Sequence, residues 1–241
     1  MTVKKRLITI SGWSATAESL APVADALPYF EEKECLSVTR LLQMNSSTEG
    51  LSPYASALAE ILDKSSALTT VTAWSMAATV VLETLAASNI TNVARLVLVN
   101  GTAAFCASEG YSCAVPAVAV RTMTAAMAVR PRQTLEAFYQ RCRYPRKISS
   151  QDLRKRVENA LACGKDALTH GLHYLRKTDL RHAVGNIDVP ALIINGRKDR
   201  IIPCDAGEYL ADLMPEAEFA AVADAGHDLP LCNPFEITRR L

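Results

Sequence analysis

The chain has 241 residues, a length that one domain of the barrel or open α/β type can fill. Hydrophobic residues make up 49% of the chain and charged residues 21%, which excludes wholesale disorder and a fibrous repeat. The net charge of +1 argues against a globally basic nucleic-acid-binding protein.

The charge is unevenly distributed along the chain. The segment from Arg121 to Arg181 holds 14 basic and 5 acidic residues, a net charge of +9, and the rest of the chain therefore carries −8. The seven cysteines are widely spread without a CxxC pair, so neither a disulfide framework nor a zinc knuckle is indicated. No apolar run is long enough for a signal peptide or a membrane span. We expect a reduced, cytoplasmic protein without a membrane partner.

Strand and helix patterns alternate in the first hundred residues. Short β-branched or apolar runs predict strands at 7–10, 71–74 and 95–100. Apolar residues at helical spacing predict helices at 15–27, at 52–62 with Pro53 in the first turn, and at 76–87. Further strands are predicted at 191–195 and 218–222. This alternation indicates an α/β fold with a mostly parallel, doubly wound sheet.

Residues 105–185 interrupt this alternation. They contain no clear strand pattern, and 132–143, 151–163 and 165–175 have helical spacing. We therefore expect an inserted helical lid at 105–185 on a core formed by 1–104 and 186–241. The basic block lies almost wholly inside this lid.

Ser75 lies between a predicted strand and a predicted helix, in the segment TVTAWSMAAT. A nucleophile on such a sharp turn needs small residues two positions away on either side, and Ala73 and Ala77 stand where G-x-S-x-G has glycines. A helix N-cap serine is the alternative interpretation.

A serine nucleophile needs a base, and the base needs an acid that orients it. Asp199 follows the strand at 191–195 and His227 follows the next strand, so the order is serine, acid, histidine. Asp205 and Asp224 are the alternative candidates for the acid. The other three histidines, His170, His173 and His182, lie in the predicted lid.

The amide of Met76, directly after Ser75, and that of Trp13, in the loop after the first strand, are the expected oxyanion donors. The side chains of Trp13 and Trp74 can then wall an apolar pocket, or simply pack in the core. Cys163, His170 and His173 lack a fourth ligand for zinc, and the phosphate-binding glycine motifs are absent. We expect no metal and no cofactor.

The serine, aspartate and histidine order resembles that of the α/β-hydrolase superfamily over nearly the whole chain. More narrowly, the segments SGWSATAESL, AWSMAA, GLHYLRKTDLR and INGRKDRIIP resemble those of pimeloyl-acyl carrier protein methyl ester esterases of biotin synthesis. The glycines beside the serine are replaced by alanines, and LLQMNSSTEG replaces the family's D-x-P-G-x-G-x-S loop.

The resemblance implies hydrolysis of the methyl ester of a carrier-bound pimeloyl chain. Ser75 would be the nucleophile, His227 the base, Asp199 its orienting acid, and the Trp13 and Met76 amides the oxyanion hole. The stretch FYQRC resembles the family segment that lines the acyl channel. The expected substrate-binding residues are Trp13, Trp74, Phe138, Tyr139, Arg141 and Cys142.

An acyl carrier protein is strongly acidic, so a lid of net charge +9 would steer it toward the pocket. The candidate docking residues, besides Arg141, are Arg121, Arg132, Arg143, Arg146, Lys147, Arg154, Lys155 and Arg156. A nucleic acid or a small anionic substrate is the alternative partner. No nucleic-acid partner is expected, and a monomer is favoured.

Two alternatives to this function stay open. The same triad serves general carboxylesterases, thioesterases and carbon–carbon hydrolases of this fold. A binding protein that has lost catalysis and uses the basic lid as a platform is the other alternative.

Overall fold

The computed structural model describes residues 4–241. Within them lies one sheet of six strands, all parallel, in the order β2-β1-β3-β4-β5-β6. The strands are β1 (Lys5–Ser11), β2 (Glu32–Ser37), β3 (Leu68–Trp74), β4 (Val93–Val99), β5 (Ala191–Gly196) and β6 (Ala217–Val222). The central strands are buried because helices cover both faces of the sheet. The predicted fold class, a doubly wound α/β sheet, is confirmed.

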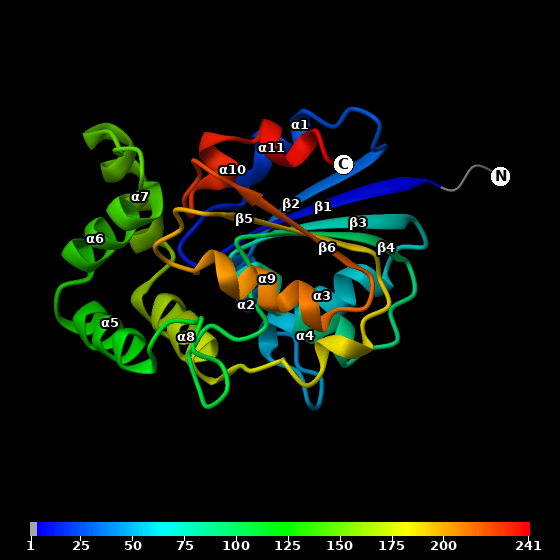
Figure 1. Cartoon of the computed structure of the whole chain (residues 1–241), viewed down its shortest axis with the longest axis horizontal. Coiled ribbons are helices and arrows are strands. Elements are labelled where there is room, and N and C mark those ends of the chain that lie inside the picture. The colour runs from blue at the N-terminus through cyan, green and yellow to red at the C-terminus, as the bar shows by residue number, and fades with distance from the viewer. Residues whose placement is uncertain (1–3) are drawn as a thin grey trace.

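Helices cover the two faces of the sheet (Figure 1). On one face lie α1 (Ala21–Asp25), α10 (Leu229–Cys232) and α11 (Phe235–Thr238). On the other lie α2 (Val38–Gln43), α3 (Pro53–Asp63), α4 (Met76–Ala86) and α9 (Cys204–Leu213). Two short 3-10 helices, η1 (Ala17–Leu20) and η2 (Val184–Asn186), complete these layers. A separate buried apolar cluster fills each side of the sheet.

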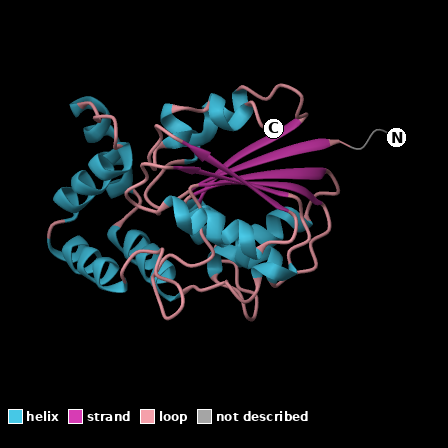
Figure 2. Ribbon diagram, viewed as in Figure 1, coloured by secondary structure: helices cyan, strands magenta, loops and turns pink. Residues whose placement is uncertain are grey.

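Four further helices form the lid: α5 (Ala117–Val129), α6 (Pro131–Arg143), α7 (Ser150–Ala162) and α8 (Lys165–Lys177). They stand beside the carboxyl ends of the strands (Figure 2). In that picture they form a group apart from the helices that cover the sheet. Ligands of open α/β sheets bind at this edge, so the lid covers the expected position of a site.

The structure differs from the predicted elements in several places. The sequence analysis missed β2 and α2; β2 reads EKECLS because it is an edge strand, only partly buried, and tolerates charged side chains. It also missed α5. The helix expected at 15–27 is replaced by η1 and the short α1, because Pro22 cannot donate a backbone hydrogen bond and separates the two turns.

Candidate active site

Ser75 occupies a strained turn between β3 and α4. Its φ is 60° and its ψ is −126°, a conformation that non-glycine residues rarely adopt. Its amide donates to the carbonyl of Val99 at the end of the neighbouring strand. Ala73 and Ala77 are completely buried, so the turn accommodates a methyl group at both positions where the common pattern has glycine. The turn presents the Ser75 hydroxyl at the carboxyl edge of the sheet.

Two loops bring an imidazole and a carboxylate to this hydroxyl. His227 Nε2 lies 2.9 Å from Ser75 Oγ, and His227 Nδ1 lies 2.7 Å from Asp199 Oδ2. The other oxygen of Asp199 accepts from the amides of Ile201 and Ile202 at 2.7 and 3.0 Å. The side chains of His227 and Asp199 are 2% and 0% exposed. Because the carboxylate has all its partners supplied by the protein, it can orient the imidazole and stabilise its protonated form.

Asn100 joins the two loops that carry these side chains. Its Nδ2 donates to the carbonyls of Gly226 and His227 at 3.1 and 2.8 Å, and its Oδ1 accepts from the Gly196 amide at 2.9 Å. The carbonyl of His227 also accepts from Trp74 Nε1 at 2.9 Å. Two side chains therefore hold the backbone of the histidine loop: Trp74 at the end of β3 and Asn100 directly after β4.

The loop after β1 packs directly against the Ser75 turn. A Cβ atom on Gly12 would lie 2.6 Å from the Trp74 carbonyl oxygen and 2.8 Å from Ser75 Cβ, so only glycine fits there. Among the turn and loop hydrogen bonds of residues 4–241, the amides of Trp13 and Met76 donate to no backbone carbonyl. Both amides are thus available for an oxyanion that forms beside Ser75.

A cavity of about 550 Å³ extends from Ser75 into the lid. Its lining is mostly apolar and comes from α5, α6 and α8, with Met123, Leu172 and Leu175 among it. Arg130, Gln133 and Arg141 supply polar groups to the same lining. The size and the few polar groups are typical of a site for a small organic ligand.

The predicted substrate-binding residues divide into two groups. Trp13, Phe138 and Arg141 line the lid cavity. Tyr139 and Cys142 do not, because consecutive residues of a helix point about 100° apart; both are 1% exposed, and Cys142 borders a small hollow beside Ser75 instead. Trp74 does not line the lid cavity either: it packs in the cluster on the other face of the sheet and borders a small hollow beside Ser75.

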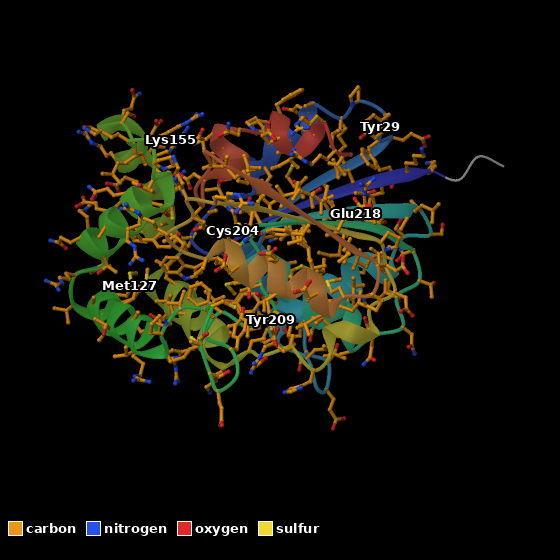
Figure 3. All side chains as sticks on the ribbon, viewed as in Figure 1. Tyr29, Met127, Lys155, Cys204, Tyr209 and Glu218 are labelled. Carbon is orange, nitrogen blue, oxygen red and sulfur yellow. The ribbon has the colours of Figure 1, made fainter. Side chains whose placement is uncertain are left out.

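The predicted docking residues also divide. The exposed residues are Arg121, Arg132, Arg141, Arg146, Lys147, Arg154 and Lys155. Figure 3 shows Lys155 near the top of the lid. Arg143 and Arg156 are instead mostly buried, and both contact Asp228 Oδ2, at 3.1 and 2.5 Å. Their guanidinium groups are therefore occupied by a buried carboxylate, and the prediction that they face a partner is wrong for them.

Asp228, like Asn100, is a residue that the sequence analysis missed. It follows His227 directly, and its side chain is 2% exposed. Its amide donates to the carbonyl of Cys142 at the end of α6, and Arg156 of α7 lies 4.1 Å from the ring of Tyr139. A buried carboxylate requires a cationic partner, but burial is a tertiary property that the segment DAGHDLP does not display. Asp228 therefore joins the histidine loop to two lid helices.

The lid is also attached to the loop after β1 and to α4. Trp13 Nε1 donates to the carbonyl of Leu168 at 2.8 Å, and Tyr139 donates to the carbonyl of Ser14 at 2.8 Å. Tyr174 donates to Glu83 at 2.7 Å. Burial raises the pKa of Tyr139 to about 12, so its hydroxyl stays protonated and keeps donating at neutral pH.

Neither a metal cluster nor a membrane helix was found in the part of the chain that the structure describes. In residues 4–241, no group of three or more His, Cys, Asp or Glu side chains is arranged to hold a metal ion. No helix in that range is long and apolar enough to span a bilayer.

A parallel sheet with a serine turn, a histidine loop and an inserted lid defines the class of α/β hydrolases, and the chain belongs to the Alpha/beta hydrolase family, whose sequence pattern matches residues 7–237. Relatives and solved structures agree. The chain is 32% identical over 170 residues to a pimeloyl-[acyl-carrier protein] methyl ester esterase of Aromatoleum aromaticum, a match that covers 67% of each chain. The protein is thus a hydrolase of this family.

A biotin biosynthesis bifunctional protein of Saccharophagus degradans is 24% identical over 242 residues. That match covers 96% of the present chain but 42% of the relative. Among solved structures, an esterase from Exiguobacterium antarcticum superposes with a TM-score of 0.85 at 17% identity, covering 100% of this chain and 91% of that one. A bromoperoxidase from Bacillus anthracis also reaches 0.85, at 15% identity and the same coverage, so these two show the fold alone.

Proposed function

We propose that this protein is a cofactor-free serine esterase that hydrolyses the methyl ester of a pimeloyl chain carried by an acyl carrier protein in biotin synthesis. The observation that carries the proposal is the line from Ser75 Oγ through His227 to Asp199 at the wall of an apolar lid cavity. The methyl ester and the carrier come from the names of the similar relatives.

In the first half of the reaction, Ser75 Oγ attacks the ester carbonyl carbon and His227 Nε2 takes its proton. The negative charge that develops on the carbonyl oxygen is stabilised by the amides of Trp13 and Met76. The C–O bond to the methoxy group then breaks, that oxygen takes the proton from Nε2, and methanol leaves. An acyl-enzyme remains on Ser75.

In the second half, a water molecule gives a proton to His227 Nε2 and attacks the acyl carbon. The bond to Ser75 Oγ breaks and Oγ recovers the proton. The free carboxylate leaves. In both halves Asp199 keeps the imidazole in the tautomer that accepts at Nε2 and stabilises the imidazolium.

The lid supports the choice of a long acyl chain on a carrier. Its cavity of about 550 Å³ offers apolar walls for methylene groups. The exposed basic residues of the lid, Lys155 among them, would attract an acidic carrier and raise the association rate in a salt-dependent way. Monomeric state and cytoplasmic location stay predictions.

The decisive experiment incubates the purified protein with a pimeloyl-carrier methyl ester and follows the loss of the methyl group by mass spectrometry. The expected result is demethylation by the wild type and none by Ser75→Ala. A fluorophosphonate probe should label Ser75. Rescue of a biotin-requiring strain that lacks its methyl ester esterase is the matching test in cells.

The alternative functions give different outcomes. A general carboxylesterase or thioesterase would hydrolyse small soluble esters at least as well as carrier-linked ones, without salt dependence. An inactive binding protein would hydrolyse neither and would not be labelled. Either result contradicts the proposal.

A further inference from the structure

Two hollows of very different size meet at Ser75. The large one is the lid cavity of about 550 Å³. The small one has a volume of about 10 Å³, the space of a single water position. Ser75, Trp13 and Phe138 line both, whereas His227 lines the small hollow and not the large cavity.

The chemistry assigns a different part of the substrate to each hollow. The oxygen of the leaving alcohol takes its proton from His227 Nε2, so it must lie within hydrogen-bond reach of that atom, about 2.6–3.2 Å. The attacking water of the second half gives a proton to the same nitrogen and must occupy the same place. Because His227 borders the small hollow, the alkoxy group belongs there and the acyl chain belongs in the large cavity.

We infer that the small hollow is the alcohol site and that it restricts the enzyme to methyl esters, with Cys142 as a specificity-determining residue. This inference rests on the proposed esterase function. It assigns a place in the structure to the methoxy group, which the proposed function took from the names of the relatives. The methyl carbon of the methoxy group and a water molecule are each close in size to one water position. An ethoxy group adds a methylene for which the hollow has no space.

The walls of the small hollow are fixed. Cys142 is 1% exposed, and burial raises the pKa of its thiol well above the ordinary value, so it stays a neutral sulfur. Its carbonyl accepts from the Asp228 amide. Arg156, another wall residue, is held by its contact with Asp228 Oδ2 and by the ring of Tyr139. Moving Arg156 to enlarge the hollow would break this buried ion pair, so this wall is fixed.

The test compares methyl, ethyl and propyl esters of one short carboxylic acid. For the wild type, kcat/KM should fall about tenfold or more from methyl to ethyl, since one extra methylene in a tight site discriminates by that factor. Cys142→Ala removes the sulfur and should raise the ethyl-to-methyl ratio at least about fivefold. Cys163→Ala removes the same atom from the end of α7, outside both hollows, and should leave that ratio unchanged.

A second measurement needs no variant. Added methanol should compete with water for the acyl-enzyme and form methyl ester, whereas 1-propanol at equal concentration should form about tenfold less of its ester. Equal rates for the three esters, or equal trapping by the two alcohols, would overturn the inference and leave the esterase function intact. A folded wild type that hydrolyses no ester and takes no fluorophosphonate label would overturn the proposed function itself, and this inference with it.

Discussion

The core and the lid hold their parts of the site by different interactions. In the core, groups that follow the central strands position the reacting side chains: two backbone amides hold Asp199, and the Asn100 side chain holds the histidine loop. In the lid, side chains make the attachments, through the ion pairs of Asp228 and the hydrogen bond of Tyr139. From this difference we expect the proposed chemistry to depend on the core, and the proposed substrate choice and carrier binding to depend on the lid.

The largest expected effect breaks the core side of this comparison. Ser75→Ala should lower kcat by about six orders of magnitude and Asp199→Asn by about four, because the hydroxyl and the orienting carboxylate act only through the triad. Initial rates with a carrier-linked methyl ester measure both, and circular dichroism checks the fold. Near-normal turnover by folded Ser75→Ala would refute the assignment of the nucleophile.

A stability effect should follow at the junction of core and lid. Asp228→Ala leaves the guanidinium groups of Arg143 and Arg156 buried without their carboxylate, which should lower the free energy of unfolding by about 3–5 kcal/mol. Urea denaturation measures the change. The exposed pair of Lys198 and Asp224 provides the control, since Asp224→Ala should change it by less than about 1 kcal/mol. Equal effects of the two variants would show that Asp228 is not a structural anchor.

Carrier binding should depend on lid charge alone. Arg154→Glu combined with Lys155→Glu should lower kcat/KM for the carrier-linked ester by about tenfold or more at low salt, and the difference should shrink at high salt. Lys33→Glu with Lys64→Glu makes the same change in net charge on exposed core residues. A similar loss in that control would mean that total charge, and not the lid surface, governs association.

The smallest effect concerns the contact between α8 and α4. Tyr174→Phe removes the hydroxyl that donates to Glu83, and the free energy of unfolding should fall by about 1 kcal/mol. Glu83 keeps its hydrogen bonds from the amide and hydroxyl of Ser52, so the carboxylate retains partners. Thermal denaturation measures the shift, and an unchanged midpoint would show that this contact contributes nothing to lid attachment.

The core was more predictable than the lid for a physical reason. Buried parallel strands are short apolar runs, and the residues that follow them gather at one edge, so Ser75, Asp199 and His227 could be expected together. The edge strand β2 escaped notice because its partly exposed positions hold charged residues.

In the lid, helical spacing indicated α6, α7 and α8, but α5 reads AVAVRTMTAAMAV and has no continuous polar face. Sequence also does not tell which charges are buried. Arg143 and Arg156 look like Arg154 in the chain, and only the position of Asp228 in space separates them. Likewise, FYQRC supplied both cavity residues and core residues from one helix.

The Asn100 side chain links the Gly196 end of β5, just ahead of Asp199, to the loop that carries His227. Its carboxamide has no proton to gain or lose over the pH range in which an imidazole titrates. We therefore expect the spacing between the Asp199 loop and the His227 loop to stay the same when the imidazole gains and loses a proton in the proposed reaction. We expect a neutral link of this kind to keep Asp199 and His227 aligned through both halves of the proposed reaction.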